Sequence, residues 1–474
     1  MKQKNLIYIF ADQWRASALG YANEDPVITP NMDSFCRESV YCSHTFSTFP
    51  LCSPHRASLL TGKYPLSAGF FTNCKTGLHM RLQDEEIGIA QVLKAAGYQT
   101  GYIGKWHLDE PELNHSSFPC SGAENWDAFT PPGIRRHGFD FWYSYGAWDK
   151  HLHPHYWQDS PEKINIDQWS PEHETDVAID YLTRAGINNP APFALFISWN
   201  PPHSPYDQVP EKYLKLYEGN IPLRANVCWE NLQHHTEEKI DWTKEELIQA
   251  TKEYYAAISG LDEQFGRLIQ YLKEIGRYED TIIILSSDHG DMMGSHGLMG
   301  KHVWYEESIR IPYIIHYPGC QPRVCKTCMG SQDMMPTMLG MLNLPTPDTV
   351  EGVDCHSIIL NGQDDEEKMS FLCACPGREV YLQEFQNAGK DPKDYGWRGV
   401  RTQNYTYVVD AGYHVDFYCQ RYLYDHKKDP WQTSPLDLEL LENKEIAANL
   451  EDKISIWLER QKDTFVLYPE MKRR

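Results

Sequence analysis

No apolar run in this sequence approaches the roughly 20 residues that a helix needs to cross a bilayer. The first apolar stretch, from Leu6 to Phe10, has the length of a strand and is too short for a signal peptide. We therefore expect a protein that neither spans a membrane nor carries an export signal, and that acts in the cytoplasm. A signal removed ahead of this sequence would change the expected compartment to the periplasm.

Positive charge is also scarce. Lysine and arginine number 44 against 66 aspartate and glutamate residues, so the 474-residue chain has a formal net charge of −22. Nucleic acids and anionic membrane surfaces are normally bound by clustered lysine and arginine, so neither is expected as a partner. An anionic substrate would have to be attracted by a local group of cations.

The cysteines do not form a disulfide framework. Their number, 13, is odd, and they are scattered without a regular spacing, which is typical of free thiols in a reducing compartment. Cys325 and Cys328 have the spacing of a zinc knuckle, but the nearest second pair, Cys373 and Cys375, has the wrong gap. We therefore interpret both pairs as solitary thiols.

Repeats and low-complexity tracts are absent as well, and 41% of the residues are hydrophobic, which is typical of a globular protein. The length of 474 residues allows about two to four domains. A capping-box signature at Thr243 and Glu246 begins a helical apolar pattern that continues to Leu272. Short apolar runs rich in β-branched or aromatic residues predict buried strands. The alternation of such runs with helical patterns predicts an α/β fold with a large mixed or mostly parallel sheet flanked by helices. The predicted strands are 6–10, 100–103, 193–199 and 281–285.

The residue composition of the sequence changes near residue 345. Pro345-Thr346-Pro347 and the acidic run 364–367 precede a strand-like run at 405–409 and a last helical pattern near 444–460. We predict a larger α/β domain over residues 1–345 and a smaller α+β subdomain over residues 346–474.

Residues suited to catalysis follow each predicted strand. A single aspartate at a strand end more often caps a helix or forms a turn. Four clusters at one edge are different, because open α/β sheets bind ligands at the carboxyl ends of their strands. The clusters are Asp12-Gln13 after the first strand, Lys105 and His107 after the second, His203 after the third, and Asp288-His289 after the fourth.

Cys52 lies at the predicted start of a helix. Ser53 can cap this helix, Pro54 suits its first turn and Gly62 can end it, which places Cys52 just outside the N-terminus. That position favours anions and a lowered thiol pKa, and Arg56 adds a cation one turn on. The alternative is a buried, inert cysteine. A tyrosine-phosphatase-like loop is disfavoured, because it needs five residues between Cys and Arg and here there are three.

The segment Cys52-Ser53-Pro54-His55-Arg56, continued by Leu60-Thr61-Gly62-Lys63, resembles the C-x-P-x-R signature of type I sulfatases. The cysteine of that signature is oxidised after translation to formylglycine. The resemblance implies an alkaline-phosphatase-like fold, and the chain looks like a bacterial carbohydrate sulfatase. Matching segments cover nearly the whole chain: Asp12-Gln13, 104–107, 201–203, 287–291, 297–301, 332–337 and 396–402.

The resemblance also implies a mechanism. One hydroxyl of hydrated formylglycine, here from Cys52, attacks the sulfur and expels the alcohol, and the second hydroxyl then eliminates sulfate, so one difficult displacement becomes two easier steps. A formylglycine-generating enzyme or an anaerobic sulfatase-maturating enzyme is the implied partner. The implied roles are as follows: Arg56 and Lys105 hold the formylglycine, His107 takes its proton, His203 protonates the leaving oxygen, and Lys301 binds the sulfate.

One divalent cation is implied as a cofactor, with Asp12, Gln13, Asp288 and His289 as ligands beside residue 52. The family often has Asp-Asp and Asp-Asn at these two pairs of positions, so Gln13 and His289 lower the charge of the site. Oxygen ligands favour calcium or magnesium, whereas the imidazole also allows manganese or zinc.

The segment from Trp142 to Trp157 is unusually rich in aromatic residues. These side chains form either a wedge in the core or a wall of the substrate site. The segment also contains His151, His153 and His155, but no carboxylate or cysteine has a suitable spacing for a second metal site, so exposed loop histidines are favoured.

The predicted substrate is a small sulfated sugar, a mono- or oligosaccharide cut at an exposed sulfate, because the acidic chain lacks the basic surface that a long polyanion requires. Two other functions remain open: a phosphonate monoester or phosphodiester hydrolase with the same fold, and a catalytically silent binder of sulfated glycans. The residues expected to contact the sugar are Trp148 and His153 from the aromatic segment, and Trp397, Arg398 and Arg401 from the smaller subdomain.

Overall fold

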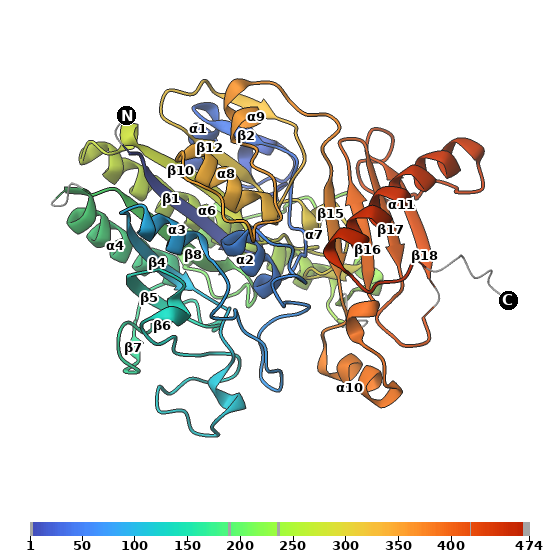
Figure 1. Cartoon of the computed structure of the whole chain (residues 1–474), viewed down its shortest axis with the longest axis horizontal. Helices are drawn as coiled ribbons and strands as arrows, with labels where there is room; N and C mark the ends of the chain where they lie inside the picture. The colour runs from blue at the N-terminus through green and yellow to red at the C-terminus, as the bar shows by residue number, and fades with distance from the viewer. Residues whose placement is uncertain (1–2, 188–190, 235–237, 418, 468–474) are drawn as a thin grey trace.

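The computed structural model describes residues 3–187, 191–234, 238–417 and 419–467, and its main feature is a mixed eight-stranded sheet (Figure 1). The strand order is β13-β2-β12-β10-β1-β8-β4-β5. The four strands predicted from the sequence are the adjacent central members β10, β1, β8 and β4, and they are parallel to one another. β12 runs antiparallel to both of its neighbours. The bounds are β1 (Asn5–Asp12), β2 (Val40–Cys42), β4 (Gln99–Lys105), β5 (Phe141–Tyr145), β8 (Phe193–Pro202), β10 (Thr281–Ser287), β12 (Tyr313–His316) and β13 (Arg323–Cys325).

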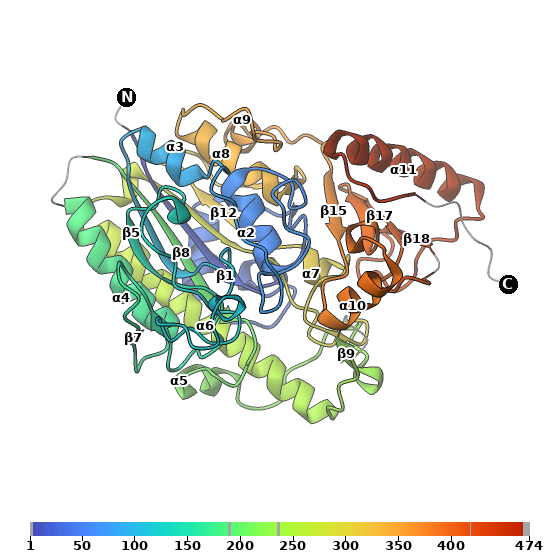
Figure 2. The ribbon, with the colours of Figure 1, turned by 60° about the horizontal axis from the view of Figure 1, so that its bottom comes forward.

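Alternate residues of the central strands point to opposite faces of the sheet, and helices cover both faces (Figures 1 and 2). In β1, Ile7 and Ile9 belong to one hydrophobic core, and Tyr8 and Phe10 belong to the other. The first core is covered by α1 (Pro30–Arg37), α4 (Ser170–Leu182), α5 (Glu211–Leu214) and α6 (Lys244–Glu274), and the second by α2 (Cys52–Thr61), α3 (Ile89–Ala95), α8 (Met334–Met341) and α9 (His356–Asn361).

The longest helix, α6, begins where the sequence predicts. The hydroxyl of Thr243 accepts a hydrogen bond from the backbone of Glu246 at 3.2 Å, and the Glu246 carboxylate accepts one from the backbone of Thr243 at 2.7 Å. This reciprocal cap satisfies donors that the first turn leaves without partners.

The smaller subdomain is a four-stranded antiparallel sheet in the order β15-β16-β17-β18, with α11 packed on it (right of Figure 1). The predicted strand at 405–409 and the predicted last helix are both present. Beyond residue 345, where the sequence predicts the boundary, Cys355 and Ile359 are still buried in a core of the larger sheet. The elements are β15 (Ser370–Ala374), α10 (Glu379–Ala388), β16 (Trp397–Arg401), β17 (Tyr405–Asp410), β18 (Gln420–Asp425) and α11 (Leu441–Gln461).

The two sheets share a third core. Phe46, Phe49 and Leu51, which precede α2, pack with residues of the smaller sheet such as Trp397 and Val400. The segment that leads into Cys52 is therefore held between the two units. The remaining short elements are β3 (Thr45–Phe46), β6 (His155–Tyr156), β7 (Ile164–Asn165), β9 (Gln233–His234), β11 (Leu298–Met299), α7 (Glu306–Ile309) and β14 (Met329–Gly330).

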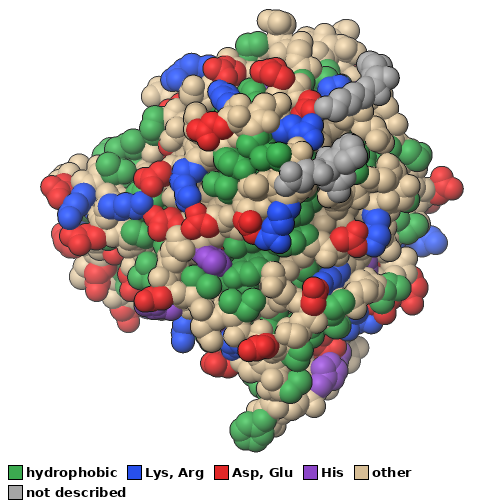
Figure 3. All heavy atoms as spheres, turned by 90° about the vertical axis from the view of Figure 1, so that its left-hand side faces the viewer, with side chains coloured by type: hydrophobic (Ala, Val, Ile, Leu, Met, Phe, Trp, Pro, Cys, Tyr) green, Lys and Arg blue, Asp and Glu red, His purple; other side chains and the backbone are tan. Residues whose placement is uncertain are grey.

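The surface agrees with the acidic composition. On the face at the left of Figure 1, basic side chains lie among acidic ones and form no broad basic area (Figure 3). Among the described residues, no helix is both long enough and apolar enough to cross a bilayer.

Candidate active site

Two buried carboxylates lie side by side at the carboxyl edge of the sheet. β1 pairs with β10 in parallel register, with Ala11 opposite Ser287, so Asp12 and Asp288 extend from neighbouring strand ends. Both side chains are fully buried. The backbone N–H of Gln13 donates to an oxygen of Asp288 at 3.0 Å, which fixes that carboxylate in place.

Cys52 is the first residue of α2, so the helix begins two residues earlier than the sequence predicts. Leu51, not Ser53, occupies the cap position. The Ser53 hydroxyl instead donates to the carbonyl of His107 at 2.7 Å and accepts from the backbone of Cys74 at 3.0 Å. Gly62 ends the helix in the left-handed conformation, as predicted.

The Cys52 sulfur faces the carboxylates. It lies 3.6 Å from an oxygen of Asp12 and 3.4 Å from Nε2 of His289. Donor atoms of Asp12, Cys52, Asp288 and His289 all lie within 4.8 Å of one another in a buried cluster. Two carboxylates, an imidazole and a thiol make a donor set that fits a divalent cation.

Arg56 connects the two carboxylates. One terminal nitrogen of its guanidinium lies 3.0 Å from Asp12 and 3.2 Å from Asp288. The other donates to the carbonyl of Lys105 at 2.6 Å and to the hydroxyl of Ser198 at 2.7 Å. A planar, forked cation satisfies several acceptors at once, so the signature arginine joins the strand ends around it.

Lys105 and His107 come from the end of β4. The Lys105 ammonium lies 2.8 Å from Asp12 and donates to the side-chain oxygen of Asn200 at 3.0 Å. Nε2 of His107 lies 3.0 Å from the carbonyl of Cys74, which orients the ring. Burial lowers the pKa of His107, and its interaction with the Cys52 sulfur opposes that shift. A neutral imidazole beside residue 52 can accept a proton.

The charges around the cluster set its protonation. Burial raises the pKa of the Cys52 thiol, but the ammonium groups of Lys301 and Lys105 outweigh burial and hold it well below its usual range. For Asp12, burial is likewise outweighed, here by Lys105 and other nearby cations, so its pKa is lowered. Burial raises the pKa of Asp288 to about 6, and the neighbouring charge of Asp12 adds to the rise. Asp288 is hard to ionise next to Asp12, and a bound cation would relieve this repulsion, which also indicates a cation site.

Gln13 and Lys301 lie next to the cluster, on the side that faces a cavity. The Lys301 ammonium donates to the side-chain oxygen of Gln13, and the Gln13 amide donates to Asp291. Asp291 also accepts from the hydroxyl of Tyr206 at 2.6 Å. The amide of Gln13 thus holds Lys301 at the border between the cluster and a cavity.

His203 lies beyond Lys301, on the loop after β8. Its Nδ1 donates to the carbonyl of Ser204 at 2.6 Å and lies 3.5 Å from an oxygen of Asp149. Asp149 in turn accepts from the amide of Asn200 at 3.1 Å. This leaves Nε2 of His203 as the ring atom available to a bound molecule.

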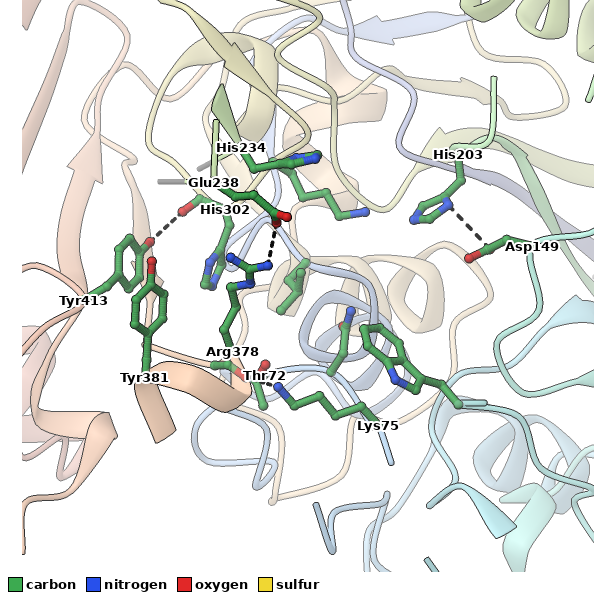
Figure 4. A pocket seen from close by; sticks show the side chains of 15 residues that line it. Thr72, Lys75, Asp149, His203, His234, Glu238, His302, Arg378, Tyr381 and Tyr413 are labelled. Carbon is green, nitrogen blue, oxygen red and sulfur yellow. Dashed lines mark hydrogen bonds and ion pairs between the residues drawn. The ribbon is translucent and has the colours of Figure 1, made fainter. Parts of the chain in front are cut away.

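A cavity of about 370 Å³ opens over these residues. Figure 4 shows His203 and Asp149 on one side and Lys75, Arg378 and Tyr381 on the other. The volume suits a sugar-sized ligand rather than a large surface. The cavity is lined by Leu51, Thr72, Asn73, Lys75, Trp126, Asp149, His203, His234, Glu238, Lys301, His302, Gly377, Arg378, Tyr381 and Tyr413.

Three residues predicted to contact the sugar are buried and bond to other parts of the protein. Trp397 is fully buried and its indole N–H donates to the carbonyl of His302 at 3.1 Å. Arg398 is equally buried and pairs with Asp463 at 2.7 Å, and Arg401 pairs with Glu306 at 2.8 Å. None of the three lines the cavity, because β16 turns these side chains into the core and the seam between the sheets.

The aromatic segment from Trp142 to Trp157 packs mainly in the protein core. Trp142, Tyr145, Tyr156 and Trp157 are buried. Trp148 is nearly buried and lines a neighbouring hollow rather than the cavity. His153 lies away from the cavity, exposed and within 2.8 Å of Asp167.

The sequence offers little signal for the residues that do line the cavity. Lys75, Trp126 and Arg378 lie in loops without a recognisable spacing, and Glu238 follows the short strand β9. They come together only because the fold joins segments that lie up to 303 residues apart (378 − 75).

The fold and the cluster define a hydrolase of the alkaline-phosphatase-like superfamily. Residues 4–344 match the family model described as Sulfatase, and residues 294–460 match that described as N-sulphoglucosamine sulphohydrolase, C-terminal. The chain belongs to the sulfatase family, so the resemblance, the fold class and the enzyme class predicted from the sequence are confirmed.

Relatives match along nearly the whole chain. An endo-4-O-sulfatase of Bacteroides thetaiotaomicron is 34% identical over 94% of this chain and 90% of its own. An ulvan-active sulfatase of Formosa agariphila is 33% identical over 95% of this chain and 81% of its own. A solved B. thetaiotaomicron structure, from work on the metabolism of multiple glycosaminoglycans, superposes with a TM-score of 0.85 at 32% identity over 97% of each chain. A phosphonate monoester hydrolase of Agrobacterium radiobacter, 20% identical with a TM-score of 0.76, shares the fold alone.

Proposed function

We propose that this sulfatase hydrolyses sulfate esters of carbohydrates through a formylglycine made from Cys52. The observation that carries the proposal is the place of Cys52, at a helix N-terminus beside two buried carboxylates and the cations Lys105 and Lys301. Relatives named for carbohydrate sulfates match at 33% and 34% identity, which supports a sugar as the substrate.

Each residue of the site has a role in this chemistry. One hydroxyl of the hydrated aldehyde at position 52 gives its proton to the neighbouring Asp12 carboxylate and attacks sulfur, and the bond between sulfur and the sugar oxygen breaks. Lys301 stabilises the sulfate oxygens, and Nε2 of His203 gives the proton that the leaving sugar oxygen needs. His107 then takes a proton from the second hydroxyl, the carbon–oxygen bond to sulfate breaks, and the aldehyde forms again.

A divalent cation completes the proposal, and calcium is the first choice. Asp12, Asp288 and His289 would hold it, together with the oxygen that replaces the Cys52 sulfur and with Gln13 at the open side. Once bound, the cation would supply positive charge for the sulfate oxygens. Oxygen in place of sulfur makes the donor set harder, which favours calcium or magnesium over zinc.

A small sulfated mono- or oligosaccharide fits the cavity of about 370 Å³. Trp397, Arg398 and Arg401 do not line this cavity, so the sugar would contact the residues that do line it. A silent binder is disfavoured, because the cysteine, its cations and the histidines lie together in one site.

The test compares sulfate and phosphonate esters. The chain is produced with a maturation enzyme, the peptide containing residue 52 is examined by mass spectrometry, and release is measured on matched pairs of esters. We expect formylglycine at position 52 and faster hydrolysis of the sulfates. Cys52→Ala should abolish turnover, whereas Cys36→Ala, which alters another buried cysteine in α1, should not. Full activity with an unmodified Cys52 would refute the mechanism.

A further inference from the structure

Two loops from different units meet at one end of the cavity. Lys75 comes from the segment after α2, and Arg378 directly precedes α10 of the smaller subdomain. Both side chains line the cavity on the side away from His203 (Figure 4). The site therefore has a second group of cations, separate from Lys105 and Lys301.

A glycine makes this meeting possible. A Cβ atom at Gly377 would lie 2.1 Å from the hydroxyl oxygen of Thr72, far closer than two such atoms can approach. The Lys75 ammonium donates to the carbonyl of Gly377. This close contact between the loops sets Arg378 beside Lys75.

The electrostatics of this end of the cavity favour an anion. Burial lowers the pKa of Lys75 to about 8, and the charge of Arg378 contributes to the shift, while Glu379 opposes it. Among the described residues, Glu238 also lies 2.6 Å from Arg378, with side chains 58% and 43% exposed. Ion pairs as exposed as this one contribute little to stability, so a ligand can displace the Glu238 carboxylate from Arg378 at little cost.

The rest of the cavity suits a sugar that reaches from the sulfate site to this end. Lys301 and His203 line the same cavity as Lys75 and Arg378. Trp126, at the rim, is 43% exposed although it is a large apolar side chain. An indole face open to a cavity commonly packs on the apolar face of a sugar ring.

We propose that Lys75 and Arg378 form an anion-binding subsite that recognises an acidic group on the sugar adjoining the one that loses its sulfate. The acidic group is the carboxylate of a uronic acid or a second sulfate. This inference rests on the proposed function, since it assumes that the scissile sulfate lies at Lys301.

The test uses disaccharides that share one sulfate ester and differ in the neighbouring sugar. That sugar carries a carboxylate, the corresponding alcohol, or the alcohol with a second sulfate, and an activated aryl sulfate serves as a substrate without it. Arg378→Gln and Lys75→Gln should each raise KM for the acidic disaccharides about tenfold or more, because a charge-assisted contact is lost. Activity on the neutral disaccharide and the aryl sulfate should stay unchanged. The matched control is Arg267→Gln, which breaks an exposed pair of similar geometry with Asp176, and neither of these residues lines the cavity.

Equal KM values for acidic and neutral disaccharides in the unaltered enzyme would overturn the subsite. So would an equal loss on all substrates in both variants, which would indicate a structural role for the two cations. The comparison of the two acidic arms tells which anion is preferred. If no ester is hydrolysed, the proposed function fails, and calorimetry with the desulfated acidic disaccharide tests the subsite by itself: binding that Arg378→Gln weakens supports it, and no binding overturns it.

Discussion

At the scale of single residues, the site depends on one arginine between two buried acids. Asp12 and Asp288 cannot both stay ionised at close range in a buried place without cations beside them. Arg56 supplies such a cation and also bonds the carbonyl of Lys105 and the hydroxyl of Ser198. Its role is thus to hold the strand ends in register as well as to balance charge.

Replacing Arg56 by lysine should show this double role. An ammonium is a point charge and cannot reach the same four acceptors, so we expect kcat/KM to fall about 10²-fold or more and the thermal midpoint to drop. Arg136→Lys, which alters another buried arginine outside the site, should lower stability without a comparable loss of activity. An Arg56→Lys enzyme with unchanged kcat/KM would show that the forked geometry is unimportant.

Asp410 in β17 gives a prediction about pH. Burial raises the pKa of this carboxyl from 3.8 to about 7, and a backbone N–H from Gly412 opposes the shift only in part. The folded protein therefore holds a proton that the unfolded chain releases, so stability is lost as pH rises from about 4 through 7.

Asp410→Asn should remove this loss. The variant should be more stable than the unaltered enzyme at pH 8, by up to a few kcal/mol at about 1.4 kcal/mol per pKa unit, and the difference should shrink toward pH 4. Thermal melts across this range provide the measurement, with Asp167→Asn, whose carboxylate is 93% exposed, as the control. A difference that does not vary with pH would contradict the assignment.

The residues that meet at the strand ends were predictable from the sequence to a much greater extent than the residues that line the cavity. Asp12, Lys105 and Asp288 lie at the ends of recognisable strands, and parallel strands bring such ends to one edge. The burial of Arg398, by contrast, could not be predicted, because the period of a strand tells which residues share a face but not which face is covered. Lys75 and Arg378 could not be paired, because only the packing of two loops brings them together.

At the scale of elements, the end of β4 is held very close to β8. Gly104 has a φ of +95°, and a Cβ atom there would lie 2.1 Å from the carbonyl oxygen of Ser198. That approach places Lys105 and Ser198 together around Arg56. A glycine is required here both for its backbone conformation and for space.

Gly104→Ala should therefore push the two strand ends apart. We expect a loss in kcat/KM of about 10²-fold or more, because a displacement near 1 Å has such an effect on a catalytic group. Gly97→Ala is the matched control: its φ is +87°, but its Cβ would meet nothing within 4 Å, so it should cost about 1 kcal/mol of stability and spare activity. Equal effects of the two changes would mean that backbone strain alone matters.

The regular elements were predicted more reliably than their borders. Period and capping signals defined the central strands and α6, since a buried strand and a capped amphipathic helix each have a strong local pattern. The start of α2 was missed by two residues, because the Ser53 hydroxyl bonds to His107 and Cys74 inside the site instead of capping the helix. Local capping preferences cannot anticipate such tertiary bonds.

At the scale of the whole molecule, the smaller subdomain supports the active site without contributing to the buried cluster. Phe46, Phe49 and Leu51, ahead of Cys52, are covered by its sheet. A chain that ends at residue 369 retains every residue from Asp12 to Lys301 but uncovers this apolar patch. We expect it to aggregate and to lack activity, measured as soluble yield and sulfate release. A soluble, active fragment would show that the catalytic unit is independent.

The burial of Cys52 also limits when this residue can be modified. The side chain is 1% exposed in the folded chain, so the proposed conversion to formylglycine has to precede folding around it. Residue 52 leaves the ribosome early, whereas Asp288 and the sheet that covers Leu51 are synthesised much later. At ~5–20 residues per second, this order leaves a maturation enzyme some tens of seconds with an accessible cysteine. The rate of translation, rather than the affinity of the finished enzyme, would then decide what fraction of the molecules becomes active.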